Sequence, residues 1–173
     1  MNDRTPGTYS AGLSHVGADG AARMVDVGGK PITARIASAE GFVRISPELE
    51  RAIRENSVKK GAVLDVARLA AILAAKRTDE LIPLCHTLPL EEVDVETVLE
   101  PGRVKVTATV RTQARTGVEM EALTAVSVAC LTVIDMGKAI DKGMVIEGVR
   151  VLEKHGGRSG SYTTAPTPPE GRP

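Results

Sequence analysis

A buried helix is predicted by the segment TGVEMEALTAVSVACLTVIDMGK, residues 116–138. Residues 122–134 carry no charge and consist only of Ala, Leu, Val, Ile, Cys and three hydroxyl residues. A helix that is apolar on all sides packs in a core or a subunit interface. Thr116, followed three residues later by Glu119, fits a capping box, so the helix is expected to begin there and to end near Gly137.

Ionisable residues stand at both ends of this helix. Glu119 and Glu121 lie at its start, and Asp135 and Lys138 lie at its end. Sixteen residues separate Glu119 from Asp135, which at the helical rise is about 24 Å. The two groups cannot contact one substrate within a single subunit. Either one group alone is functional, or the site is assembled between subunits.

The remaining elements predict an α+β fold. Residues 33–45 contain enough Ile, Val and Phe for a strand. They also contain Ala and Gly, so the sequence does not decide between a helix and a strand there. Ser46-Pro47-Glu48 predicts a short helix to about Arg54. Alternating residues of 89–99 and 103–114 predict a hairpin with cross-strand charge pairs, and residues 144–152 predict a final strand.

A second long helix is predicted over residues 61–77. Its apolar residues recur at steps of three and four and form one stripe: Val63, Val66, Ala67, Ala70, Leu73 and Ala74. The order is then strand, helix, strand, strand, helix, strand, the split βαβ arrangement. We expect an antiparallel sheet with two long helices on one face.

Composition narrows the class of protein. The 22 basic and 22 acidic residues cancel, so no overall charge draws the chain to nucleic acid or an anionic membrane. The uncharged run of residues 122–134 is too short to cross a bilayer. Both cysteines, Cys85 and Cys130, lie within apolar runs, so a reducing, cytoplasmic setting is expected. We divide the chain into a flexible arm (1–13), one catalytic domain (14–160) and a flexible tail (161–173).

Three residues are candidates for acid–base chemistry. Asp135 and Lys138, three apart on a helix, share one face, and Lys60 precedes the start of the second helix. Spacing alone favours a surface ion pair for Asp135 and Lys138 and a solvated basic turn for Lys60. Low dielectric next to the uncharged helix favours the functional interpretation, since the pKa values of acids and lysines move there.

A further candidate is His86, in a loop held out of helix by Pro83 and Pro89. A single histidine in such a loop is more often a hydrogen-bonded structural residue than a catalyst. Cys85 and His86 have no second Cys/His pair at zinc spacing, so no metal site is predicted. Walker and Rossmann glycine motifs are lacking, so lysines and arginines such as Lys30 would have to hold any phosphate.

Three motifs in order, MVDVGGK (24–30), IPLCHTLPL (82–90) and the run from Thr116 to Lys154, closely resemble the cyclic pyranopterin monophosphate synthase family of molybdenum cofactor biosynthesis. The resemblance implies a ferredoxin-like core and a hexamer built as a trimer of dimers. It also implies a lyase that converts (8S)-3',8-cyclo-7,8-dihydro-GTP, a purine-derived triphosphate, to cyclic pyranopterin monophosphate and pyrophosphate.

The resemblance also assigns residues. Asp135 and Lys138 match the family's catalytic pair, and Lys60 matches a lysine needed for turnover. Arg35 matches a phosphate-binding arginine. The substrate-binding residues that we predict are Leu84, Cys85, His86, Glu119, Met120, Arg35, Glu121 and Lys154. No tightly bound cofactor is expected, although the participation of a divalent metal such as Mg²⁺ is left as an alternative.

A non-catalytic module is the alternative, because split βαβ folds also serve as ligand sensors and RNA binders. RNA binding is disfavoured, since the predicted hairpin strands contain no aromatic residue on which bases could stack. Only two observations argue against the interpretation as a ligand sensor: the polar residues at the helix ends and the family resemblance. The sequence does not distinguish which catalytic residue is the acid and which the base.

Overall fold

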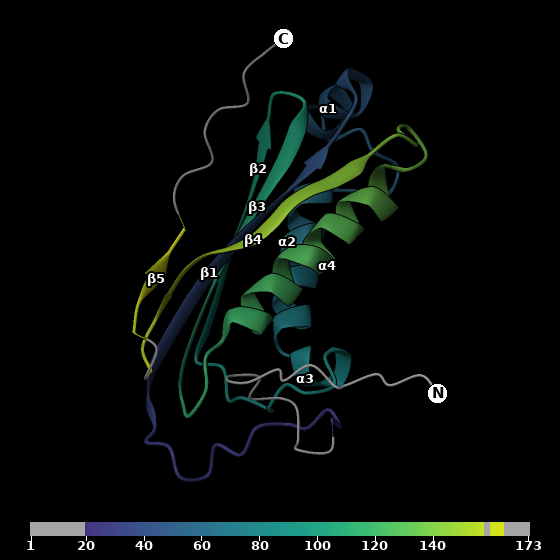
Figure 1. Cartoon of the computed structure of the whole chain (residues 1–173). Helices are drawn as coiled ribbons and strands as arrows, with labels where there is room; N and C mark the ends of the chain where they lie inside the picture. Colours follow the sequence, from purple (N-terminus) through teal and green to yellow (C-terminus); the bar gives the residue numbers. More distant parts are fainter. Residues whose placement is uncertain (1–19, 158–159, 165–173) are drawn as a thin grey trace, which may run out of the picture.

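A computed structural model describes residues 20–157 and 160–164 (Figure 1). The predicted arm, residues 1–13, lies outside the described residues. The elements, in chain order, are β1 (Thr33–Arg44), α1 (Pro47–Arg54), α2 (Val63–Ala75), α3 (Thr78–Leu81), β2 (Glu92–Glu100), β3 (Arg103–Ala114), α4 (Glu119–Gly137), β4 (Val145–His155) and β5 (Tyr162–Thr163).

The five strands form one antiparallel sheet in the order β2-β3-β1-β4-β5. Both long helices, α2 and α4, cover the same face of this sheet (Figure 1). The expected α+β architecture is therefore confirmed. The first crossover, β1 to β2, carries α2, and the second, β3 to β4, carries α4.

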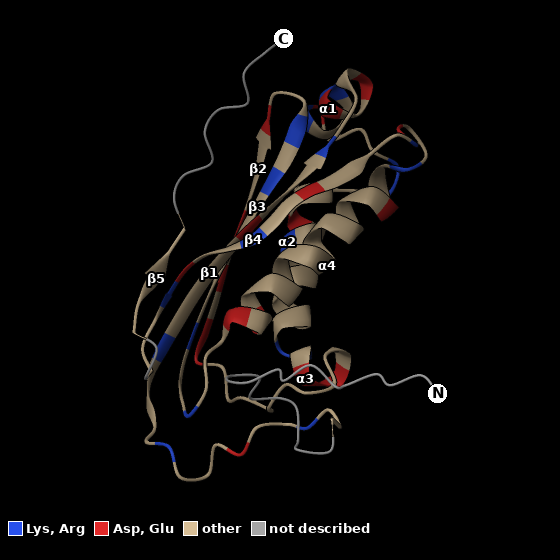
Figure 2. Ribbon diagram, in the orientation of Figure 1, with Lys and Arg blue, Asp and Glu red and all other residues tan. Residues whose placement is uncertain are grey.

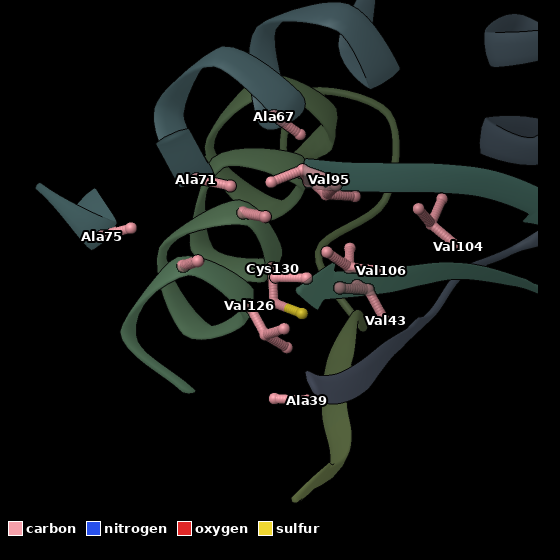
Figure 3. Packing of buried hydrophobic residues seen from close by; sticks show 14 of the residues in the cluster. Ala39, Val43, Ala67, Ala71, Ala75, Val95, Val104, Val106, Val126 and Cys130 are labelled. Atoms are coloured by element: carbon pink, nitrogen blue, oxygen red, sulfur yellow. The ribbon is translucent and has the colours of Figure 1, made fainter. Parts of the chain in front are cut away.

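Strand β1 settles the choice that residues 33–45 left open. It is the central strand, and its alternate residues Ala37, Ala39 and Val43 are fully buried. Figure 3 shows Ala39 and Val43 within this core. Gly41 lies on the same face, where a Cβ would come within 2.6 Å of Val126 Cγ1 on α4. Small residues in β1 therefore let α4 lie close to the sheet.

Helix α4 ends at Gly137 as predicted, but the capping box is wrong. Its N-cap is Val118, with no side-chain cap hydrogen bond, and Glu119 pairs instead with Lys154. An ion pair with another element thus replaces the local bond that the sequence pattern offered. By length and hydropathy α4 could cross a membrane, but it is packed against α2, β1 and β3 as a core helix.

Helix α2 corrects the predicted apolar stripe. Ala67, Ala71 and Ala75, at steps of four, are buried (Figure 3). Val66 and Leu73, which we expected to face the core, are 41% and 58% exposed. The methyl groups of alanine bring α2 close to α4, whereas Val66, Leu69 and Leu73 point outward.

The predicted tail contains one further strand. Tyr162 and Thr163 form β5, which pairs with Lys154 and Glu153 of β4. A two-residue strand has too little sequence signal to be recognised against a Gly- and Pro-rich background. The tail prediction is therefore wrong for these two residues, and residues 165–173 lie outside the described residues.

Candidate active site

Charged residues gather at the two ends of α4 while its length is uncharged (Figure 2). At its C-terminal end, Lys60 Nζ lies 2.5 Å from Asp135 Oδ2 and Lys138 Nζ lies 2.7 Å from Asp135 Oδ1. We call Lys60, Asp135 and Lys138 the Asp135 cluster. The three predicted catalytic residues are thus in direct contact.

The carboxylate of the Asp135 cluster is held in its charged form. Hydrogen bonds from Lys138 and Lys60 lower the pKa of Asp135 to about 2. All three side chains are about half exposed. Asp135 can therefore accept a proton or orient an ammonium group near neutral pH, while the two lysines can donate to an anion.

The turn before α2 carries Lys60 to this cluster. Gly61 adopts a positive φ of 95°, and its N–H donates to the Val58 carbonyl, which reverses the chain. A residue with a Cβ rarely adopts that φ. Because α2 then packs along α4, the turn lies beside the last turn of α4.

Two adjoining pockets occupy the other end of α4. The first, the Arg35 pocket, has a volume of about 530 Å³, and the second, the His86 pocket, about 410 Å³. Both are lined by Lys30, Thr116, Gly117 and Glu119. These shared residues form the boundary between the pockets, so one elongated ligand could occupy both.

The Arg35 pocket is rich in cations. Arg35, 9% exposed, donates from Nε to the Ala114 carbonyl, and Lys154 Nζ lies 3.1 Å from Glu119 Oε1. Lys30 and Arg115 add two positive charges to the lining. A single carboxylate faces four cations here, so the pocket favours an anion.

The His86 pocket combines apolar and carboxyl groups. His86 Nε2 lies 2.8 Å from the Val25 carbonyl oxygen. This contact holds the imidazole against the segment that precedes β1. Glu121 is 4% exposed, and burial, with a smaller contribution from the Glu119 charge, raises its pKa to about 7. Burial also raises the pKa of the Cys85 thiol, which opposes a nucleophilic role.

The structure brings the predicted residues together in two groups. All eight predicted substrate-binding residues line the two pockets. The three predicted catalytic residues lie at the opposite end of α4. Since α4 runs from Glu119 to Gly137, the separation of about 24 Å stands.

Sequence reasoning missed two residues of the Arg35 pocket. Arg115 donates from Nε to the Lys30 carbonyl, and His155 lies beside Lys154 on the pocket wall. Arg115 stood next to the motif that begins at Thr116, which is the one signal that could have identified it. Within residues 20–157 and 160–164, no three His, Cys, Asp or Glu side chains are grouped to hold a metal ion.

The chain is similar to proteins of known name over most of its length. A protein from Methylobacterium sp. (strain 4-46) named cyclic pyranopterin monophosphate synthase is 62% identical over 90% of this chain and 99% of its own. Proteins of the same name from Methylobacterium nodulans and Streptomyces coelicolor are 60% and 56% identical, over 89% and 87% of this chain and 98% and 89% of their own lengths. The MoaC family model matches residues 24–157, which include both pockets and the Asp135 cluster, and the chain belongs to the MoaC family.

Proposed function

We propose that this chain is a cyclic pyranopterin monophosphate synthase of molybdenum cofactor biosynthesis. It converts (8S)-3',8-cyclo-7,8-dihydro-GTP to cyclic pyranopterin monophosphate with release of pyrophosphate. The observation that carries the proposal is the 62% identity over 90% of the chain to a protein of that name. The cation-rich pocket and the lysine–aspartate cluster supply the groups that this reaction needs.

The substrate divides between the two pockets. Its triphosphate binds in the Arg35 pocket, where Lys30, Arg35, Arg115 and Lys154 neutralise the charge that develops on the leaving pyrophosphate. Its purine-derived ring binds in the His86 pocket, where Glu121 and the backbone-bonded His86 orient it. Glu119, which lies between the pockets, faces the sugar.

The Asp135 cluster performs the proton transfers. Since the pKa of Asp135 is about 2, this residue is a carboxylate at neutral pH and acts as a base or orients a lysine. Lys60 and Lys138, both bonded to it, donate protons or stabilise developing negative charge.

A complete site requires two subunits. A two-fold axis across the helical layer would place the start of one α4 beside the end of its partner's α4. Apolar side chains on the outer surface of the helices support such a contact: Val66, Leu69 and Leu73 of α2 and Leu131 of α4 are 41–62% exposed. Exposed apolar residues gathered on one face indicate a protein interface.

The remaining features of the proposal come from the family resemblance. The dimers assemble as a hexamer, a trimer of dimers, in the cytoplasm. No tightly bound cofactor takes part, and a divalent metal such as Mg²⁺ would enter with the triphosphate, because phosphate oxygens are its preferred ligands.

A turnover assay tests the proposed function. The cyclised dihydro-GTP intermediate is incubated with the protein, and pyrophosphate and the cyclic monophosphate are measured together. Equal amounts of both products support the proposal. Saturable binding of the intermediate without either product would contradict it and would support a ligand sensor.

A further inference from the structure

Strand β5 fastens the end of the described chain to β4. The Thr164 N–H donates to the Leu152 carbonyl at 2.7 Å, and its hydroxyl donates to the Val151 carbonyl at 2.7 Å. Ser161 Oγ lies 3.0 Å from His155 Nδ1. Short hydrogen bonds therefore hold both ends of residues 161–164 against the strand that carries Lys154 and His155.

Gly156 and Gly157, the first residues after β4, form part of the wall of the Arg35 pocket. Gly156 and Gly157 have φ values of 96° and 82°, and the Gly160 N–H donates to the Gly157 carbonyl. A Cβ on Gly157 would overlap Nη1 of Arg35, and one on Gly156 would overlap the Ala34 carbonyl oxygen. Bare backbone is thus pressed directly against the buried guanidinium.

Arg35 is therefore held from two sides. The Ala114 carbonyl accepts from its Nε, and Gly157 packs against its Nη1. The first contact belongs to the centre of the sheet, where β1 pairs with β3. The second depends on a turn whose far end is held by β5 together with Ser161 and Thr164 on either side of it.

We propose that β5 is a positioning strap for the phosphate-binding pocket, with Thr164 as its main anchor. The strap holds Gly157 on Arg35 and Lys154 beside Glu119, so that the cations face the phosphates before the substrate arrives. This inference rests on the proposed function for the identity of the anion. It predicts that releasing β5 weakens phosphate binding while the Asp135 cluster, at the far end of α4, keeps its rate.

The test uses three full-length variants. Thr164→Pro removes the N–H and the hydroxyl that bond to β4, whereas Thr164→Ser keeps both. Thr163→Pro is the matched control: along an edge strand alternate N–H groups point away from the neighbouring strand, so this substitution removes no bond to β4. Measured for each are the dissociation constant of inorganic pyrophosphate, KM and kcat for the cyclised intermediate, and Tm.

The expected result is a rise of about tenfold in the pyrophosphate dissociation constant and in KM for Thr164→Pro, equivalent to about 1.4 kcal/mol. Its kcat should stay within about twofold, and Thr164→Ser and Thr163→Pro should match the wild type. Unchanged pyrophosphate affinity in Thr164→Pro would overturn the strap. So would an equal effect of Thr163→Pro, which would show a general effect of proline.

The role of β5 can be tested even if Thr164→Pro does not fold or the proposed function is wrong. Should Thr164→Pro fail to fold, Thr164→Val removes the hydroxyl bond alone, and an unchanged pyrophosphate dissociation constant in that variant overturns the proposal. Should the wild type bind pyrophosphate but lack turnover, the proposed function fails while the binding comparison still decides the role of β5.

Discussion

The Lys60 ammonium donates twice to one residue: Nζ lies 2.5 Å from Asp135 Oδ2 and 2.9 Å from the Asp135 main-chain oxygen. Asp135 stands in the last turn of α4, and Lys60 stands in the turn that leads into α2. The carbonyl that accepts is one of the helix's last, where a cation is favoured by the helix dipole. Lys60 therefore joins the two helices at the point where the chemistry is proposed to occur.

Asp135→Asn should abolish most of the turnover without unfolding the protein. The amide keeps the shape of the side chain but cannot accept a proton, and general acid–base catalysis contributes about 10²–10⁴-fold to rates. We expect kcat to fall by at least about 100-fold, with a nearly unchanged Tm because the side chain is 54% exposed. Steady-state pyrophosphate release measures this, and near-normal kcat would remove Asp135 from catalysis. Since the pKa of Asp135 is about 2, no decline in rate between pH 5 and 8 should arise from it.

Lys60→Ala and Lys59→Ala form a matched pair. Lys60 bonds to Asp135, whereas Lys59, its neighbour on the same exposed turn, does not. Loss of a charge-assisted hydrogen bond costs about 1.5–3 kcal/mol, which lowers kcat/KM about 10- to 150-fold for Lys60→Ala. Lys59→Ala should keep its kcat/KM. Equal losses in the two variants would indicate a general effect of positive charge instead.

Glu121 should make stability depend on pH. Its pKa rises from 4.5 to about 7 on folding, so the protonated form is favoured in the folded state. The stabilisation from this group is complete below pH 4.5 and is lost as pH rises through about 7. Glu121→Gln, which cannot ionise, lacks this loss. Tm of the wild type should therefore fall relative to that of Glu121→Gln between pH 5 and 8, and parallel curves would contradict the raised pKa.

Subunit complementation tests the shared site. Glu119→Ala and Asp135→Asn are each expected to be inactive, and mixed dimers contain one pocket with both groups intact. Mixing the two under conditions of subunit exchange should restore part of the activity. Exchange is verified by mass spectrometry of differently labelled subunits. Confirmed exchange without activity would leave one of the two groups with a structural role only.

Leu69→Glu should weaken subunit association. Leu69 is 62% exposed at the centre of the outer face of α2, and burial of a leucine stabilises a contact by about 1.5–3 kcal/mol. A carboxylate there must lose its hydration on association, so the assembly mass measured by light scattering should fall together with turnover. Val98→Glu is the control, because Val98 lies on β2 and is not part of the helical face. Dissociation of both variants alike would not support a helical interface.

Much of the fold could be predicted because local pattern and final packing agree. Ser46 caps α1 through Leu49 N, and the alternation of Val104, Val106 and Val110 is buried as expected. The predictions that were wrong depended on distant partners. Glu119 could have capped α4 at Thr116, but Lys154 of β4 pairs with it.

The candidate site was predictable residue by residue but not as a shape. The eight predicted substrate-binding residues all line the two pockets, whereas Arg115 and His155 were missed. The resemblance did not indicate that Arg115 holds the Lys30 carbonyl or that Gly157 packs on Arg35, since both are contacts between segments remote in sequence. Such contacts depend on the register of the strands across the sheet. That register cannot be read from a single sequence.

Gly41 shows how far a change inside the core would reach. A Cβ there would come against Val126 Cγ1 and Val149 Cγ2, so any larger residue must lift α4 away from β1. Because α4 carries Glu119 at one end and Asp135 at the other, the lifted helix would displace both. If each pocket draws one end from each of two subunits, a single altered chain spoils two pockets. In a random mixture, a pocket is intact only when both of its chains are normal. The fraction of active pockets therefore equals the square of the fraction of normal chains, and a minority of altered chains would remove a disproportionate share of the activity.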